Sequence, residues 1–289
     1  MRSFWFHPLR AALLSAVLSA ALVAAYPART VAAHVLEGPH VLDLTAEAMG
    51  RIAALQVDQK LLIYPESPDV TPTVLDETAT YIMPQRFRSD IQAERIRRTY
   101  LVFGESAMTV IDGRMAVGES PFDRYQGLLR SRTREQLMHS LGRMGVETAI
   151  SSLGRVDDAV VYVIGARYPD ESVSQLAVDK ETFLPLRLLL VDRPQDADGA
   201  RLAIYYRSWR KVQKGWFPFQ VTFHAGDRLV RELRVADLRD NPSVPAEMMD
   251  LEALKASLAL DAAQTPQAQK QEAVEAVRKA VQEFRKKFE

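Results

Sequence analysis

The feature of this sequence that most restricts its fold is a succession of segments with a two-residue hydrophobic period between residues 78 and 238. Such a period is typical of β-strands, whose side chains point alternately to opposite faces. Short polar turns join neighbouring segments, and Asp112-Gly113 supplies the positive φ that a tight hairpin needs. The pattern predicts about nine or ten strands, mostly linked by hairpins, and therefore one antiparallel sheet that is strongly curved or barrel-like.

Helical spacing interrupts and flanks this β pattern. Residues 45–55 begin with Thr45, a residue suited to cap a helix, and residues 121–145 carry apolar side chains at intervals of three and four. Residues 246–260 are also expected to be helical, whereas residues 64–76, with three prolines, are expected to form a loop. The predicted fold class is therefore α+β, mainly β.

Several of the expected strands are apolar on both faces. Residues 160–164 are apolar at every position, and residues 183–191 nearly so. An antiparallel sheet with one face in water should show one polar face, so both faces of this sheet must be covered. The sheet could curl around an apolar interior, with the 121–145 helices over the opening. The periodicity leaves two arrangements open: a hollow interior, or a barrel or sandwich core filled by its own side chains.

Composition excludes several classes of function. Lys+Arg and Asp+Glu both number 37, so the formal charge is zero, which argues against a broad nucleic-acid interface. The chain has no cysteine, which excludes disulfide scaffolds, cysteine-zinc sites, iron–sulfur clusters, thiol catalysis and lipidation on cysteine.

Residues 1–33 have the character of a secretory signal peptide. Arg2 and Arg10 precede an apolar run over residues 11–25, which is shorter than the about 20 residues of a spanning helix, and small residues suited to cleavage end at Ala25 or at Ala33. An uncleaved N-terminal anchor is the alternative. We expect an exported protein, and without disulfides the bacterial periplasm suits it best.

Catalytic and metal-binding motifs were not found. His34, His40, His139 and His224 are scattered without metal-ligand spacing, and the sequence holds no GxSxG, P-loop or GxGxxG motif. Residues 95–98 form a basic stretch that is expected to make a charge pair or a solvated face rather than an anion site. We therefore expect no enzyme activity, no metal and no cofactor.

Short motifs in three hairpin segments match those of a known superfamily. Residues 175–187 (QLAVDKETFLPLR) follow a "lwVDketllPlr" hairpin, residues 205–209 and 215–219 match the next hairpin, and residues 83–89 match an early "P-x-x-F-R" strand. Over roughly residues 44–255 the chain resembles the LolA-like superfamily of outer-membrane lipoprotein-sorting proteins.

The resemblance implies a half-open antiparallel β-barrel with a helical lid and a hydrophobic cavity. The chain departs from the family after residue 255, where a charged amphipathic helix is expected instead of a short final strand. In this superfamily, LolA-like carriers move the acyl chains of lipoproteins across the periplasm, and RseB-like members sense mislocalised lipids or lipoproteins. LolB-like members are themselves lipoproteins, and the absence of cysteine excludes this chain from that branch. We predict a periplasmic carrier or binding protein that shields acyl chains of lipoproteins or lipids for transfer toward the outer membrane. The resemblance also implies an inner-membrane release complex and an outer-membrane acceptor as partners.

The resemblance and the strand pattern together predict the site. Residues 34–260 would form the half-barrel domain. In this superfamily an arginine on an early strand holds the lid closed, and Arg88, or else Arg86, lies in the matching segment. Leu128, Leu129 and Leu137 are expected in the lid. The expected cavity residues are Ile82, Tyr100, Val102, Tyr162, Ile164, Leu176, Val178, Leu186, Leu188, Ile204, Tyr206, Phe217, Phe219 and Val221.

Residues 261–289 form a charged tail, and within it residues 267–289 have apolar side chains at spacings of three and four. This pattern predicts an amphipathic helix. The helix could pack on its own domain or fray, or it could dock on a partner or a membrane. Docking on a partner would give an alternative function: a periplasmic sensor or interaction module that docks a membrane-protein partner through its C-terminal helix.

Overall fold

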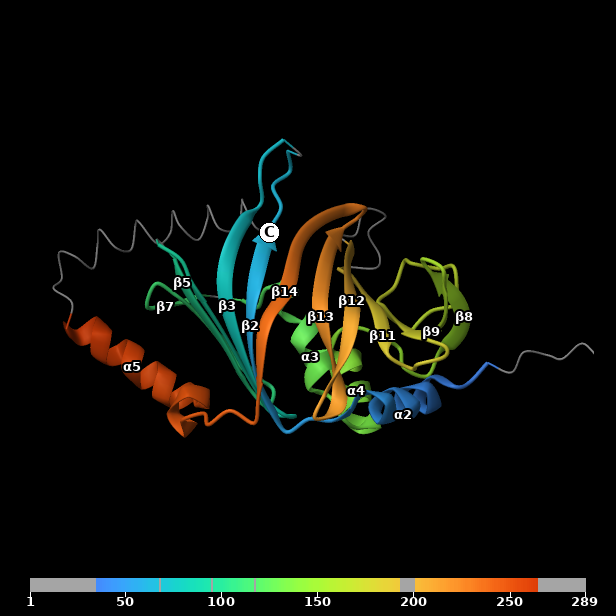
Figure 1. Ribbon diagram of the computed structural model, residues 1–289, viewed down its shortest axis with the longest axis horizontal. Helices are drawn as coiled ribbons and strands as arrows, with labels where there is room; N and C mark the ends of the chain where they lie inside the picture. The colour runs from blue at the N-terminus through green and yellow to red at the C-terminus, as the bar shows by residue number, and fades with distance from the viewer. Residues whose placement is uncertain (1–34, 68, 95, 117, 193–200, 265–289) are drawn as a thin grey trace, which may run out of the picture. The chain divides into compact units, whose positions relative to one another are not determined.

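The main feature of the computed structural model, which describes residues 35–67, 69–94, 96–116, 118–192 and 201–264, is a single antiparallel sheet of 14 strands. Figure 1 shows how its strands follow one another across the molecule. The strands are β1 (Gly50–Arg51), β2 (Ala54–Ile63), β3 (Thr73–Ile82), β4 (Arg86–Gln92), β5 (Arg97–Phe103), β6 (Ser106–Ile111), β7 (Arg114–Ala116), β8 (Ser151–Val156), β9 (Ala159–Ile164), β10 (Gln175–Asp179), β11 (Pro185–Val191), β12 (Arg201–Val212), β13 (Lys214–Ala225) and β14 (Arg228–Asp240).

The sheet consists of two meanders that meet in its middle. Strands β2 to β7 pair in sequence order, as do strands β8 to β14, and the pairing of β2 with β14 joins the two sets. The short β1 pairs with β13 beside this path. The end strands β7 and β8 do not pair with each other, so the sheet formed by the described strands stays open. This confirms the predicted mainly β, half-open antiparallel architecture.

Turn residues fix the hairpins locally. Asp112 and Gly113, between β6 and β7, have φ angles of 49° and 78°, as the sequence predicted. The carboxylate of Asp112 also accepts a hydrogen bond from the backbone N–H of Arg97 at 2.8 Å, which ties the turn to β5. Between β10 and β11, the carboxylate of Asp179 accepts from the backbone N–H of Thr182 at 2.7 Å.

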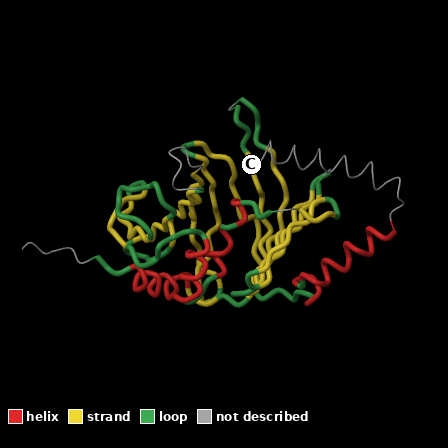
Figure 2. Tube along the Cα trace, turned by 180° about the vertical axis from the view of Figure 1, so that it is seen from behind, coloured by secondary structure: helices red, strands yellow, loops and turns green. Residues whose placement is uncertain are grey.

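Four helical segments cover one face of the sheet. They are α2 (Gly38–Met49), the 3₁₀ helix η1 (Pro121–Asp123), α3 (Tyr125–Arg130) and α4 (Arg134–Arg143). Figures 1 and 2 show these helices on the concave side of the strands. The helices η1, α3 and α4, which we call the lid, lie in the connection between the two end strands β7 and β8. The lid is therefore the segment that links the two open edges of the sheet.

Hydrophobic side chains pack on both faces, as the sequence predicted. The main cluster lies between the concave face and the helices. A smaller cluster lies on the opposite face of β8 to β10 and contains Val156, Val161, Val163, Ala166 and Ala177. Alternation along β9 explains the division, since Tyr162 and Ile164 belong to the main cluster and Val161 and Val163 to the smaller one.

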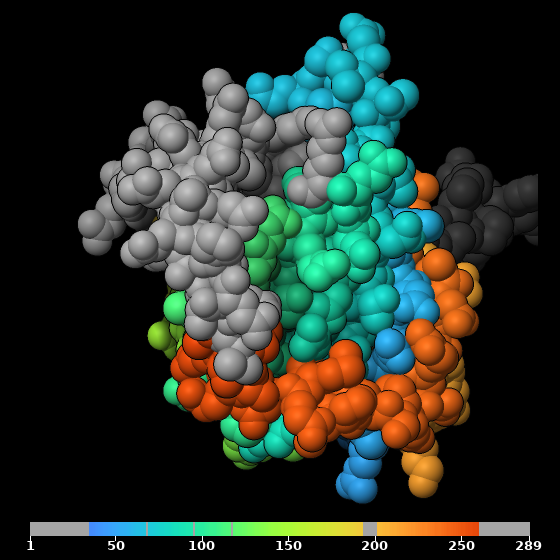
Figure 3. Space-filling model, turned by 90° about the vertical axis from the view of Figure 1, so that its left-hand side faces the viewer, coloured from blue at the N-terminus to red at the C-terminus, as the bar shows by residue number. Residues whose placement is uncertain are grey.

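The C-terminal part of the described chain forms the 3₁₀ helix η2 (Ala246–Met249) and α5 (Leu251–Gln264), close to the predicted helix at 246–260. Figure 3 shows η2 and α5 beside the surface of strands β3 to β6, and η2 contacts β4 and β5. The predicted amphipathic tail beyond Gln264 and the predicted signal peptide at 1–33 lie outside the described residues. Among the described helices, none is long and apolar enough to span a membrane.

The structure differs from the sequence prediction near the N-terminus. The helix predicted at 45–55 covers Gly38–Met49 instead, and the hydroxyl of Thr45 donates to the carbonyl of Val41 at 2.9 Å within the helix rather than capping it. Strands β2 and β8 were not predicted, and β3 begins at Thr73, inside the predicted loop.

Candidate functional site

The concave face carries most of the residues that were expected to line a cavity. Eleven of them belong to the main cluster, and each is at most 6% exposed. The lid residues Leu128, Leu129 and Leu137 are at most 1% exposed and pack in the same cluster. The eleven are Tyr100, Val102, Tyr162, Ile164, Leu176, Val178, Leu188, Ile204, Tyr206, Phe217 and Val221.

Three of the expected residues do not belong to the main cluster. Ile82 is only half-buried and does not belong to the main cluster, and Leu186 packs against the smaller cluster on the opposite face. Phe219 is half-buried, and the guanidinium of Arg210 lies 4.3 Å from its ring centroid. Phe219 lies between Phe217 and Val221 in the strand alternation and borders a small cavity of the interior, although it is less buried than either neighbour.

Side chains fill the space between the concave face and the lid in this conformation. A cavity bordered by Tyr81, Tyr125, Leu129 and Phe217 has a volume of about 10 Å³. A site of roughly 10–15 Å³ is the least that holds one water molecule. An acyl chain could therefore enter this interior only if the lid moved away from the sheet.

A larger pocket, which we call the lid-edge pocket, opens between the lid and strands β5 and β6. Its volume is about 340 Å³, within the range of roughly 300–1,000 Å³ that is usual for small-molecule sites. Tyr100 and Val102 of β5 and Ala107 of β6 form one wall, and Gly127 and Met144 are among the lid residues opposite. Since Tyr100 and Val102 also belong to the main cluster, this pocket borders the apolar interior.

A buried ion pair fastens the first end of the lid to the sheet. The guanidinium of Arg98 on β5 donates to the carboxylate of Asp123 on η1, and the two side chains are 8% and 10% exposed. Burial raises the pKa of Asp123 in spite of the opposing effect of Arg98 and Arg231. The guanidinium of Arg231 on β14 lies 3.8 Å from the ring centroid of Phe122, which adds a cation–π contact to the same end.

Three hydrogen bonds hold the rest of the lid. The guanidinium of Arg130 donates to the carbonyl of Pro84 at 2.9 Å, and the hydroxyl of Tyr206 donates to the carbonyl of Tyr125 at 3.2 Å. Arg132 donates to the carbonyl of Met49 at 3.1 Å, where it meets the C-terminal end of α2. Burial lowers the pKa of Arg132 to about 10.

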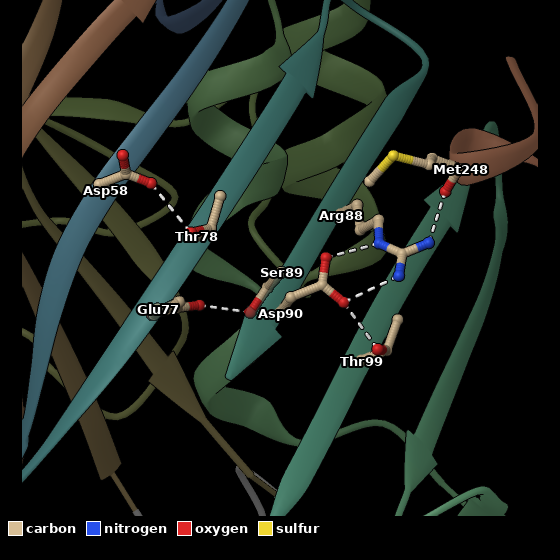
Figure 4. A network of polar contacts seen from close by, with 8 residues as sticks. All are labelled: Asp58, Glu77, Thr78, Arg88, Ser89, Asp90, Thr99 and Met248. Atoms are coloured by element: carbon tan, nitrogen blue, oxygen red, sulfur yellow. Dashed lines mark hydrogen bonds and ion pairs between the residues drawn. The ribbon is translucent and has the colours of Figure 1, made fainter. Parts of the chain in front are cut away.

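The two arginines expected to gate the lid lie on the face of β4 opposite to the main cluster. Figure 4 shows Arg88 donating to both carboxylate oxygens of Asp90, at 2.6 and 2.9 Å, and to the carbonyl of Met248 in η2 at 2.8 Å. The guanidinium of Arg86 lies 4.7 Å from the ring centroid of Phe103. In this structure, Arg98 and Arg231 of the sheet contact η1, and Arg130 of the lid itself contacts Pro84. For Arg98 the sequence indicated only a charge pair or a solvated face.

A second buried polar group lies on the concave face. Glu77 of β3 accepts hydrogen bonds from the amide of Gln59 at 2.9 Å and from the hydroxyl of Ser89, the latter drawn in Figure 4. Burial raises the pKa of Glu77, while Ser89, Gln59 and Arg98 oppose that rise. The interior is thus apolar over most of its area and polar beside β2, β3 and β4. Among the described residues, no group of three or more histidines and acids is arranged to hold a metal ion.

No protein-family model matches this sequence, and none of the curated proteins matches it. Solved structures do resemble it. A LolA superfamily protein from Nitrosomonas europaea is 13% identical and aligns over 75% of this chain and 99% of its own, with a TM-score of 0.51. A DUF1329 family protein from Desulfovibrio piger is 13% identical over 75% of this chain and 97% of its own, with a TM-score of 0.50. An outer membrane lipoprotein-sorting protein domain from Vibrio parahaemolyticus, 10% identical over 75% and 98%, has a TM-score of 0.49.

At these identities the similarity concerns the fold. The aligned part spans nearly the whole of the first two structures and three quarters of this chain. The resemblance noted in the hairpin motifs and the similarity of the folds agree, and the chain has the LolA-like fold.

Proposed function

We propose that the protein binds the acyl chains of lipids or lipoproteins and shields them between the concave face of the sheet and the lid. The observation that carries this proposal is the apolar surface that the lid covers: a single cluster to which strands β2 to β5 and β9 to β14 contribute. A carrier needs such a surface and no catalytic group. The LolA-like fold supports the same function.

The energetics favour reversible binding. Transfer of a 16-carbon chain from water to an apolar site gains at most about 13 kcal/mol, at ~0.8 kcal/mol per methylene. Loss of translational freedom removes several kcal/mol of this gain. The lid must also leave its present contacts, because the interior is filled in the closed conformation. The net affinity is therefore moderate, which suits a protein that must release its cargo.

The lid-edge pocket is the part of the site that is already open. An acyl chain that enters along Tyr100 and Val102 would meet the apolar interior next, and it would replace contacts that the lid makes with the sheet. On this proposal the polar contacts of the lid, above all Arg98 with Asp123, set the free energy of opening.

A substitution that fills the pocket tests the proposal. Ala107 lines the pocket and pairs with Val102, so Ala107→Trp should obstruct it without entering the core. Ser106→Trp, one residue earlier on the same strand and on the opposite face, is the matched control. The assay is transfer of a fluorescent diacylglycerol from phosphatidylcholine vesicles to the protein, followed after sedimentation of the vesicles.

We expect the unsubstituted protein and Ser106→Trp to take up the lipid equally, and Ala107→Trp to bind it at least about tenfold more weakly, a loss of 1.4 kcal/mol or more. Absence of uptake by the unsubstituted protein would overturn the proposed function. Equal uptake by both tryptophan variants would show that lipid does not enter at the pocket.

Export to the periplasm, exchange with an inner-membrane release complex and an outer-membrane acceptor, and the alternative role as a docking module stay predictions of the sequence. They depend on residues 1–33 and 267–289, which lie outside the described part of the chain, or on partners.

A further inference from the structure

Three guanidinium groups converge on the lid-edge pocket. Arg124 lies between η1 and α3, Arg130 is the last residue of α3, and Arg143 is the last residue of α4. All three line the same pocket of about 340 Å³, although they come from different parts of the lid. Like charges at one site repel each other, so such a cluster costs free energy unless an anion or water compensates it.

Carboxylates of the described chain do not form ion pairs with these three arginines. The hydrogen bonds of Arg130 go to neutral acceptors, the carbonyl of Pro84 at 2.9 Å and the side-chain amide of Gln126. Arg124 and Arg143 make no ion pair with any described residue. Burial lowers the pKa of Arg130, and the nearby charge of Arg143 lowers it further, so the guanidinium of Arg130 has lost hydration that no bonded carboxylate replaces.

The two carboxylates that line the pocket contact other residues of its lining rather than the arginines. Glu105 lies 3.0 Å from the imidazole of His139. Glu119 accepts a hydrogen bond from the hydroxyl of Tyr100 at 2.7 Å, and its charge raises the pKa of Arg130, opposing the effect of burial. Three arginines against two carboxylates leave an excess of positive charge in the pocket, and the two acids are held by other groups.

The same pocket borders the apolar interior through Tyr100 and Val102. A ligand that occupied both regions would need an anionic group for the guanidiniums and a hydrocarbon chain beside it. We propose that the lid-edge pocket binds the anionic headgroup of an acylated amphiphile, held by Arg124, Arg130 and Arg143. The chemical class is a lipid whose phosphate or carboxylate lies next to its acyl chain. This inference rests on the proposed function and narrows its cargo.

Guanidinium is suited to this task because its planar N–H groups match two oxygens of a phosphate or carboxylate at once. Placing the site on the lid has a further effect. A headgroup bound there bridges Arg124, which joins η1 to α3, with the last residues of α3 and α4, so it stabilises the lid as a unit while the chain occupies the interior. An uncharged lipid with the same chains gains the hydrophobic contribution alone.

The test compares two fluorescent probes with identical acyl chains: phosphatidylglycerol, which carries a phosphate, and diacylglycerol, which does not. The variant is Arg124→Gln with Arg143→Gln, which spares the hydrogen bonds of Arg130. The control with the same change of net charge is Arg134→Gln with Arg155→Gln, two exposed arginines that do not line the pocket. A fluorescent fatty acid, measured in parallel, distinguishes a site for any anion from one for phosphate. Circular dichroism melting checks that each variant folds.

We expect the unsubstituted protein to bind phosphatidylglycerol at least about tenfold more tightly than diacylglycerol, and the Arg124/Arg143 variant to lose that preference while it still binds diacylglycerol. The control variant should keep the preference. Equal binding of the two probes by the unsubstituted protein, or a preference that survives in the Arg124/Arg143 variant, would overturn the headgroup site and leave acyl binding intact. Failure to bind either probe would instead overturn the proposed function, and the headgroup site with it.

Discussion

Replacing Arg98 with methionine should destabilise the protein by about 3–5 kcal/mol at neutral pH, because it leaves Asp123 as a buried carboxylate without its main partner. Methionine has a similar length and keeps the apolar part of the packing. The side chains of Arg98 and Asp123 are 8% and 10% exposed, so water replaces little of the lost interaction. Arg231 also lowers the pKa of Asp123, so part of the favourable interaction with the carboxylate remains in Arg98→Met. We therefore expect a loss of stability toward the lower end of that range.

The companion variants separate the ion pair from the packing. Asp123→Leu alone leaves Arg98 unpaired and should cost a similar amount. The double variant Arg98→Met/Asp123→Leu buries no charge and should lie within about 1 kcal/mol of the unsubstituted protein. The free energies come from urea unfolding with linear extrapolation, and the double-mutant cycle gives the coupling between the two residues.

The pH dependence supplies an independent check. Burial already raises the pKa of Asp123, and loss of Arg98 should raise it further. The carboxyl of Arg98→Met can then take up a proton as the pH falls, so the deficit in stability should shrink between pH 7 and pH 5. A loss below about 1 kcal/mol in Arg98→Met, or a deficit that does not depend on pH, would refute the description of this contact as a buried ion pair.

Three further predictions concern the interior. The pKa of Glu77 is higher in the folded state than in the unfolded state, so ionisation of this carboxyl at high pH destabilises the folded state. Glu77→Gln should therefore have a higher Tm than the unsubstituted protein at pH 8, and this difference in Tm should vanish near pH 4. Leu137→Ala should cost about 2–5 kcal/mol in urea unfolding, since Leu137 is 0% exposed. Gly50→Ala should lower Tm strongly, because the φ of Gly50 is 68° and an added Cβ would lie 2.3 Å from the carbonyl oxygen of Lys214. An unchanged Tm would show that the backbone relaxes there.

Strands with a clear two-residue period and turn residues were predictable from the sequence. The β6–β7 hairpin follows from Asp112-Gly113, and the β12–β13–β14 meander follows from alternation along residues 200–238. These signals are local, so one segment carries enough information. The lid helices were predictable for the same reason, since α3 and α4 lie within the predicted 121–145 stretch.

Other parts depend on neighbours that are distant in the sequence. In β2 the concave face includes Gln59, a polar residue that hydrogen-bonds to Glu77, so the strand lacks a clean apolar alternation. The strand period does not reveal that Phe219 is only half-buried beside the guanidinium of Arg210, because Phe217 and Val221 at the same alternation are buried. The sequence could not show that Arg98, and not Arg88, contacts the lid. That difference depends on the face of the strand that each arginine occupies and on the position of η1.

The pairing of β2 with β14 has a consequence for how the protein is made. Strand β14 is the last of the described strands to leave the ribosome, and its partner β2 is the first long one among them. Until residue 240 has been synthesised, β2 and β13 both remain open edges, each able to recruit a foreign strand. The centre of the sheet is thus completed only after the last described strand has been synthesised, and a chain that stops before β14 should aggregate rather than persist as two independent halves.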